Sequence, residues 1–145
     1  MNANYILLVD DNPDDVELTL RSLKKNHIAN QVEVAHDGAE ALDFIFAQGK
    51  HAKRNANDLP ALVLLDLKLP KIDGLEVLRR LRADPRTKWL PIVILTSSKE
   101  DQDVAMSYKS GCNSYVRKPV GFNEFSEATR LLGLYWLILN EPPNQ

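Results

Sequence analysis

Five short stretches of the chain have the apolar pattern of strands in a buried sheet. Three of them are continuously apolar and end abruptly in polar residues, which is typical of strands that are buried on both faces. The stretch at residues 31–35 alternates between apolar and polar positions, which predicts an edge strand. The predicted strands are residues 5–9, 31–35, 61–65, 91–95 and 114–117.

Between these strands, apolar residues recur at the three- and four-residue spacing of helices that bury one face. The first helix has clear start signals, because Asn12 can cap it and Pro13 suits the first helical position. Asp14 and Asp15 complement the helix dipole in its first turn. The predicted helices are residues 13–26, 38–47, 75–83, 100–109 and 122–139.

Strands and helices therefore alternate along the whole chain. This order predicts an α/β fold with a five-stranded parallel sheet that is doubly wound, with helices on both faces and right-handed crossovers. The chain has 145 residues and shows no internal repeat, low-complexity tract or linker. We therefore expect one domain that spans residues 1–145.

The composition narrows the location and the class of partner. Hydrophobic residues make up 44% of the chain, and 18 basic against 20 acidic residues leave a net charge of −2. This balance predicts a soluble protein without the field that attracts nucleic acid or an anionic membrane. Cys112 is the only cysteine, which excludes an internal disulfide and indicates a reducing compartment. Since the sequence has neither a signal peptide nor an apolar run of membrane-spanning length, we expect a cytoplasmic protein.

Polar residues with complementary chemistry follow the predicted strands. Asp10 and Asp11 follow the first strand, Asp66 follows the third, and Thr96 and Lys118 follow the last two. Because the carboxyl ends of parallel strands meet at one edge of a sheet, we expect these side chains to lie together. Three neighbouring carboxylates need a proton or a cation between them, and hard oxygen ligands suit Mg²⁺ (or Mn²⁺). With a lysine to pair with phosphate, the set predicts a phosphoryl-transfer site in which an aspartate is the acceptor.

Four sequence motifs resemble those of one protein family. They are VDDN at residues 9–12, LLDLKLPKIDG at 64–74, ILTSS at 94–98 and YVRKP at 115–119. In this order they are similar to the motifs of the receiver domain of two-component response regulators, over about residues 5–132. The resemblance implies a flavodoxin-like (βα)5 receiver fold and a single receiver domain without an output domain. It also implies a phosphoacceptor signalling domain rather than a turnover enzyme.

The same resemblance assigns roles to the carboxylates. Asp66 would be the residue that accepts a phosphoryl group from a histidine kinase. Asp11 would bind Mg²⁺ directly, and Asp10 would bind it through water. Asp66 itself and the backbone carbonyl of Lys68 would complete the protein ligands.

Three further residues match positions that respond to the phosphoryl group in this family. Thr96 would bond one phosphoryl oxygen and move with it, and Lys118 would pair with another. Tyr115 matches the aromatic residue that turns inward when the threonine moves. The bond between Lys118 and Pro119 matches a cis peptide of the family, which X–Pro bonds adopt at low cost.

Two features depart from a typical receiver domain: the loop at residues 48–60 is longer, and the last helix is unusually apolar at its end. Both features resemble the small response regulators of cyanobacterial and other bacterial phytochromes, which implies a phytochrome-type histidine kinase as partner. The basic cluster at residues 50–54 predicts a solvated face or, alternatively, a kinase-docking element.

The end of the last helix predicts a second partner. Residues 131–139 (LLGLYWLIL) place large apolar side chains around more than two turns, so one helix face cannot bury all of them. Exposed apolar surface marks interfaces, and aromatic residues such as Tyr135 and Trp136 are favoured at their centres. We expect a two-fold homodimer through this C-terminal segment. The alternative is a tail that folds back within the monomer.

Two other function classes use sheets of this kind. An aspartyl-phosphate phosphatase usually has a second aspartate two residues after its nucleophile, and that position here is Lys68. A flavodoxin-like or dinucleotide-binding protein needs a phosphate cradle of bare amides, whereas the first strand-to-helix turn here is acidic. The phosphatase remains the alternative function, which a measurement of catalytic turnover separates from a receiver domain.

Overall fold

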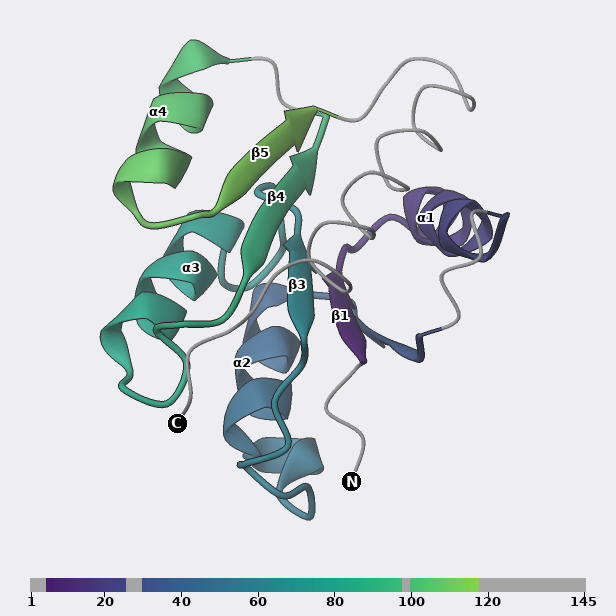
Figure 1. Cartoon of the computed structure of the whole chain (residues 1–145), viewed down its shortest axis with the longest axis vertical. Coiled ribbons are helices and arrows are strands. Elements are labelled where there is room, and N and C mark those ends of the chain that lie inside the picture. The colour runs from purple at the N-terminus through teal and green to yellow at the C-terminus, as the bar shows by residue number, and fades with distance from the viewer. Residues whose placement is uncertain (1–4, 26–29, 98–99, 118–145) are drawn as a thin grey trace.

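The computed structural model describes residues 5–25, 30–97 and 100–117. A parallel sheet lies at the centre of the fold (Figure 1). Five parallel strands pair in the order β2-β1-β3-β4-β5. They are β1 (Ile6–Val9), β2 (Val32–Ala35), β3 (Leu62–Leu65), β4 (Ile92–Thr96) and β5 (Ser114–Arg117). β1, β3 and β4 are buried along their whole length, whereas β2 at the edge is mostly half-buried. The predicted buried strands and the predicted edge strand are therefore confirmed.

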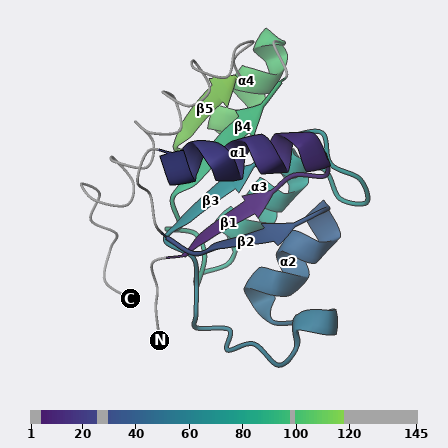
Figure 2. The ribbon, with the colours of Figure 1, turned by 90° about the vertical axis from the view of Figure 1, so that its right-hand side faces the viewer.

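Helices cover both faces of this sheet. α1 (Pro13–Lys25) lies on one side, and α2 (Gly38–Phe46), α3 (Gly74–Ala83) and α4 (Asp101–Lys109) lie on the other (Figure 1, Figure 2). Side chains of β1 alternate between the two layers, so that Leu7 packs with α2 and α3 while Leu8 packs with α1. The doubly wound α/β fold is thus confirmed. The predicted helix at residues 122–139 and the peptide bond between Lys118 and Pro119 lie outside the described residues.

The start of α1 follows the predicted capping signals. The Oδ1 atom of Asn12 accepts hydrogen bonds from the backbone amides of Asp14 at 2.9 Å and Asp15 at 3.2 Å. Pro13 is the first helical residue, where its missing N–H leaves no bond unmade. The turn after β1 is therefore fixed by its own sequence, which sets the direction in which Asp10 and Asp11 leave the strand.

The long loop after α2 packs back against the protein, and the prediction of a solvated basic face is wrong for Arg54. The loop begins with the short 3-10 helix η1 (Gly49–His51). Further along, the Arg54 guanidinium stacks 3.7 Å from the centre of the Phe44 ring and donates hydrogen bonds to the Tyr5 hydroxyl and the Asp58 carbonyl. A planar guanidinium can stack on an aromatic ring and donate hydrogen bonds to several oxygens at once. The spacing of basic residues in the sequence does not reveal whether such partners are present.

Glu40 ties this loop to the start of α2. Its carboxylate pairs with Lys50 at 2.8 Å and with His51 at 3.3 Å, and it accepts a hydrogen bond from the His36 amide at 2.9 Å. Burial alone would raise the pKa of Glu40, but the hydrogen bonds from these three partners outweigh it and lower the pKa to about 2. The ionised carboxylate is therefore the form that the folded state favours.

We expect the Glu40 interactions to stabilise the fold above about pH 4.5 and to be lost as the pH falls toward about 2. In this range the unfolded chain binds the proton more readily than the folded one, so stability decreases with decreasing pH. Urea unfolding of the wild type and of Glu40→Gln at several pH values measures the effect. The difference in unfolding free energy should shrink toward low pH, and a difference independent of pH would contradict the prediction.

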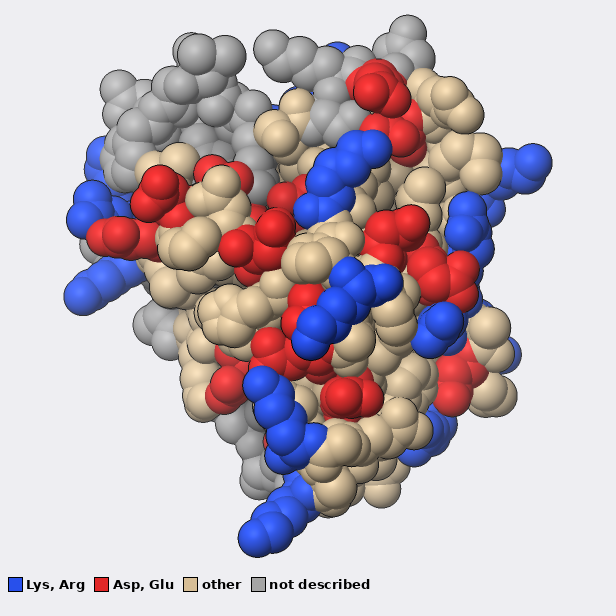
Figure 3. Space-filling model, turned by 180° about the vertical axis from the view of Figure 1, so that it is seen from behind, with Lys and Arg blue, Asp and Glu red and all other residues tan. Residues whose placement is uncertain are grey.

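Charged side chains of both signs are interspersed over the face opposite to the view of Figure 1 (Figure 3). Lys and Arg side chains alternate there with Asp and Glu side chains, in keeping with the net charge of −2. In the part of the chain that the structure describes, no helix has the length and apolar character needed to span a bilayer.

Candidate functional site

The carboxyl ends of β1, β3 and β4 meet at one edge of the sheet and carry the predicted site. Val9 is in register with Leu65, and Leu65 is in register with Ile94. The Asp66 amide donates a hydrogen bond to the Val9 carbonyl at 3.0 Å, which extends the β1–β3 ladder by one residue. Asp10 and Asp66 therefore leave neighbouring strands at the same level, because the parallel register aligns them.

Three carboxylates come together at this edge. Asp10, Asp11 and Asp66 each offer a carboxylate oxygen, and these oxygens all lie within 4.8 Å of one another. Asp10 is 1% exposed and Asp66 is 8% exposed, whereas Asp11 is exposed. Like charges repel at such distances, and a divalent cation relieves the repulsion. Because carboxylate oxygens are ligands that Mg²⁺ and Mn²⁺ prefer, this donor set fits either ion.

Three donors hold one oxygen of Asp66. Its Oδ1 atom accepts a hydrogen bond from the Thr96 hydroxyl at 2.6 Å. The same atom accepts from the backbone amides of Leu67 at 2.7 Å and Lys68 at 3.4 Å. Thr96 is fully buried at the end of β4, so its hydroxyl is shielded from water. These contacts fix the orientation of the Asp66 carboxylate and bring Thr96 directly against it.

The two aspartates after β1 have different surroundings. Oδ1 of Asp10 accepts a hydrogen bond from the Asn12 amide at 3.0 Å, and the Asp10 amide donates to the Ala35 carbonyl at 3.0 Å. Asp10 is thus held below the surface. Asp11 is exposed at the turn into α1, which leaves its side chain accessible to a ligand from solvent.

Two glycines leave no room for a side chain beside the loop that follows Asp66. A Cβ atom on Gly74 would lie 2.1 Å from the carbonyl oxygen of Asp66. A Cβ atom on Gly38 would lie 1.7 Å from the carbonyl oxygen of Ile72. Residues 67–73 are therefore held closely between the starts of α2 and α3, and any larger residue at either glycine would displace this loop.

Tyr115 and Lys118 belong to the next strand and its continuation. Tyr115 in β5 is half-buried against the core on the side of α2 and α3, and its amide donates to the Tyr108 hydroxyl at 3.2 Å. It is in register with Ile94, two residues before Thr96. Lys118 lies outside the described residues. The predicted site residues that the structure brings together are Asp10, Asp11, Asp66 and Thr96.

Two features beside the site had no signal in the sequence pattern. One is the close approach of Gly38 to the loop after Asp66. The other is an ion pair between Lys68 in this loop and Asp103 in α4, with 3.5 Å between the charged atoms. Each joins residues that are about 35 positions apart along the chain, so only the packing of the helices brings them together.

Comparisons with known proteins agree with this geometry. A family model for the response regulator receiver domain matches residues 6–130. The response regulator Rcp1 of Synechocystis sp. is 35% identical over 132 residues, which are 91% of this chain and 88% of Rcp1. The probable methanogenesis regulatory protein FilR2 of Methanothrix harundinacea is 36% identical over 138 residues, which are 95% of this chain and 86% of FilR2.

Solved structures of similar proteins have the same fold. The phosphorylated cyanobacterial phytochrome response regulator RcpA has a TM-score of 0.89 at 31% identity, covering 99% of this chain and 100% of RcpA. The Mn²⁺-bound form of Rcp1 has a TM-score of 0.87 at 33% identity, covering 97% and 99% of the two chains. The bacteriophytochrome response regulator AtBRR has a TM-score of 0.75 at 49% identity, covering 97% and 100%. Because the family model and these relatives cover nearly the whole chain, the protein belongs to the response regulator receiver domain family.

Proposed function

We propose that Asp66 accepts a phosphoryl group from the phosphohistidine of a histidine kinase. The observation that carries this proposal is the surroundings of its carboxylate. One oxygen of Asp66 lies 2.6 Å from the Thr96 hydroxyl, and two further carboxylates lie within 4.8 Å. Such a cluster of like charges destabilises a fold unless it binds a cation, so a purely structural role does not account for it.

The chemistry is a transfer between two nucleophiles. A carboxylate oxygen of Asp66 attacks phosphorus, the P–N bond of the phosphohistidine breaks, and the imidazole leaves and takes up a proton. The hydrogen bonds from Thr96 and from the amides after Asp66 orient the acceptor beforehand. Mg²⁺ or Mn²⁺ would be held by Asp10, Asp11, Asp66 and the Lys68 carbonyl, and it would neutralise charge on the phosphoryl oxygens. The Mn²⁺-bound form of Rcp1 supports this choice of ion.

Thr96 is the residue that we expect to respond first. Its hydroxyl now donates to Asp66 and can donate to a phosphoryl oxygen instead, while the Lys118 ammonium pairs with another. Because Thr96 ends β4, which pairs with the strand that carries Tyr115, its displacement changes the packing of that ring. We propose that the altered surface around β4 and β5 is what a downstream partner recognises.

The proposal is tested by phosphoryl uptake in the intact protein. Incubation with a small acyl phosphate and Mg²⁺ should add the mass of one phosphoryl group, and mild base should remove it, as expected for an acyl phosphate. Absence of this mass increment, or an increment stable to base, would overturn the assignment. Continuous release of phosphate from many phosphoesters would indicate the phosphatase instead, whereas we propose a signalling domain without substrate turnover.

Metal binding is expected to stabilise the fold. At about a hundred times the dissociation constant, Mg²⁺ should raise the unfolding free energy by about 2.7 kcal/mol through mass action. Asp11→Ala should remove this dependence, because it deletes the accessible carboxylate of the cluster. Asp14→Ala, at an exposed position one helical turn away, is the control that should retain it. Melting temperatures with and without Mg²⁺ measure the effect, and a wild type unaffected by the ion would contradict the metal site.

We propose a phytochrome-type histidine kinase as the phosphodonor, and hence the cytoplasm as the location. The support is the 49% identity to the bacteriophytochrome response regulator AtBRR and the likeness to RcpA. FilR2, which is 36% identical to this chain, is a probable methanogenesis regulatory protein, so a direct test of phosphotransfer identifies the donor. Phosphotransfer from an autophosphorylated phytochrome kinase should be much faster than from an unrelated histidine kinase, and equal rates would contradict the proposal.

We also expect a two-fold homodimer through residues 131–139, which lie outside the described residues. Sedimentation at micromolar concentration should show a dimer for the wild type and a monomer for a chain truncated after Gly133. Tyr108 is the control, since it is the large apolar side chain most exposed among the described residues, at 51%. Tyr108→Ser should remain dimeric. A monomeric wild type would contradict the expected dimer.

A further inference from the structure

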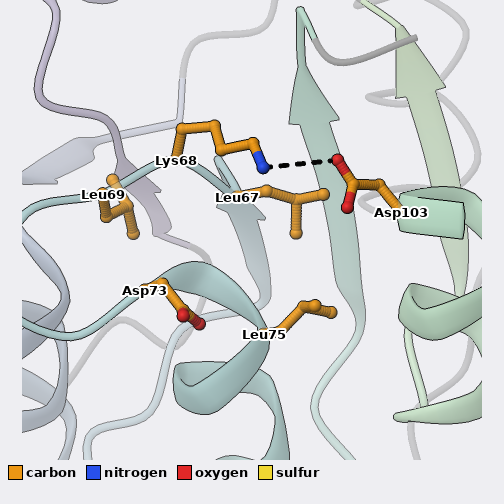
Figure 4. A pocket seen from close by; sticks show the side chains of 6 residues that line it. All are labelled: Leu67, Lys68, Leu69, Asp73, Leu75 and Asp103. Carbon is orange, nitrogen blue, oxygen red and sulfur yellow. Dashed lines mark ion pairs between the residues drawn. The ribbon is translucent and has the colours of Figure 1, made fainter. Parts of the chain in front are cut away.

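A pocket of about 300 Å³ borders the site on the side of α4 (Figure 4). Leu67 and Leu69 are buried in its wall, at 3% and 9% exposure. The side chain of Lys68 extends past Leu67 toward α4, where the Asp103 carboxylate meets it. The residues that line the pocket are Leu67, Lys68, Leu69, Asp73, Leu75 and Asp103.

The ion pair across this pocket joins an exposed cation to a shielded carboxylate. The Lys68 ammonium lies 3.5 Å from the Asp103 carboxylate, and the two side chains are 68% and 14% exposed. Asp103 sits near the start of α4, where the helix dipole favours a negative charge. The pair connects the loop after Asp66 to the helix that follows the segment after Thr96.

The loop that carries Lys68 is confined by Gly38 and Gly74, but few hydrogen bonds hold the backbone at Lys68 itself. The carbonyl of Leu67 accepts the amides of Leu69 and Gly74, and the carbonyl of Pro70 accepts two further amides. Within the described ranges, no backbone amide donates to the carbonyl of Lys68, and its own amide makes a long bond of 3.4 Å to Asp66. The ion pair of the side chain therefore adds a restraint at the position whose carbonyl is the proposed metal ligand.

We propose that Asp103 is a positioning residue for this site: through the Lys68 ammonium it fixes the backbone carbonyl of Lys68 as a metal ligand. This inference rests on the metal site of the proposed function. Asp103 itself touches neither the ion nor the reacting atoms. Its effect is to limit the motion of the Lys68 backbone within the confined loop, which lowers the cost of ordering the Lys68 carbonyl when the ion binds.

A double-mutant cycle on Mn²⁺ affinity tests the inference without using phosphorylation. Free Mn²⁺ is measured by electron paramagnetic resonance for the wild type, Lys68→Met, Asp103→Asn and the double variant. We expect each single variant to bind Mn²⁺ about two- to fivefold more weakly, the range open to a partly exposed ion pair. The double variant should bind no more weakly than the single ones, because both changes break the same contact.

Lys68→Met separates positioning from simple charge. Removing a positive charge near a cation site would strengthen Mn²⁺ binding by Coulomb's law, whereas loss of positioning weakens it. Lys71→Met is the matched control, because Lys71 lies in the same loop and pairs with Asp37 at 3.6 Å with exposures of 69% and 17%. It removes the same charge, so it should leave Mn²⁺ binding unchanged or slightly tighter.

The possible outcomes distinguish a failure of the positioning role of Asp103 from a failure of the metal site. Tighter binding by Lys68→Met, or additive effects in the double variant, would overturn the positioning role while the metal site stands. A wild type that does not bind Mn²⁺ would overturn the metal site of the proposed function and the inference with it. Weaker binding by Lys71→Met to the same extent would assign the effect to the loop in general rather than to Asp103.

Discussion

Replacement of Asp66 by Asn is expected to abolish phosphoryl uptake and to leave the fold intact. An amide oxygen does not form the acyl phosphate, so no transfer takes place. Asn keeps an Oδ1 atom, which can still accept hydrogen bonds from the Thr96 hydroxyl and the Leu67 amide. The change also removes one of three carboxylates that repel one another. The melting temperature of Asp66→Asn without Mg²⁺ should therefore equal or exceed that of the wild type.

Intact mass after incubation with a small acyl phosphate measures this prediction. Asp73→Asn is the matched control, since Asp73 lies in the same loop and caps α3 through the Glu76 amide at 3.0 Å. Asn caps helices as well as Asp does, so this variant should take up phosphate like the wild type. Uptake by Asp66→Asn at the normal rate would place the acceptor at another residue.

Replacement of Arg82 by Met is expected to lower the unfolding free energy by about 2 to 4 kcal/mol. Its guanidinium joins the end of α3 to the loops that precede β4 and β5. Met fills the space of the apolar stem but leaves the acceptors without their donor. The acceptors are the carbonyls of Gly111 at 2.7 Å, Leu90 at 2.7 Å and Lys88 at 3.0 Å, and Oδ1 of Asn113 at 2.8 Å.

Urea unfolding of Arg82→Met and Arg80→Met measures this difference. Arg80 is 51% exposed and pairs with Glu76 at 2.9 Å on the surface of α3. Such a pair contributes at most about 0.5 kcal/mol, so Arg80→Met should be nearly neutral. The Arg82 acceptors lie before β4 and β5, at the edge of the sheet opposite to Asp66. Folded Arg82→Met should therefore still take up phosphate. Equal effects of the two variants would show that the four acceptors of Arg82 find other donors.

The sequence was sufficient to predict the sheet and the central cluster for a simple physical reason. Strands buried on both faces, such as residues 61–65, must be apolar throughout, so their ends are visible where polar residues begin. A parallel sheet collects all of these ends at one edge, which brings Asp10, Asp66 and Thr96 together without any knowledge of distances. The capping of α1 by Asn12 is local and could be predicted for the same reason.

The contacts that the sequence did not predict depend on how separate elements pack. Arg54 was expected in solvent, yet it stacks on Phe44, because the path of the loop decides where its side chain points. The closeness of Gly38 to Ile72 and the pairing of Lys68 with Asp103 likewise depend on the spacing between helices. Residue type and periodicity do not encode that spacing. The role of Lys118, the single-domain organisation and the homodimer remain predictions.

Gly38 and Gly74 fix the backbone of the loop beside Asp66, while some residues of this loop face outward. Because a Cβ atom at either glycine would overlap a carbonyl oxygen, the path of this backbone is set from within the protein. Pro70 and Lys71 lie on the same loop with exposed side chains. We therefore expect substitutions at these two positions to change the outer surface of the loop while Asp66 stays in place, so that the preference for a partner can evolve without loss of the proposed acceptor.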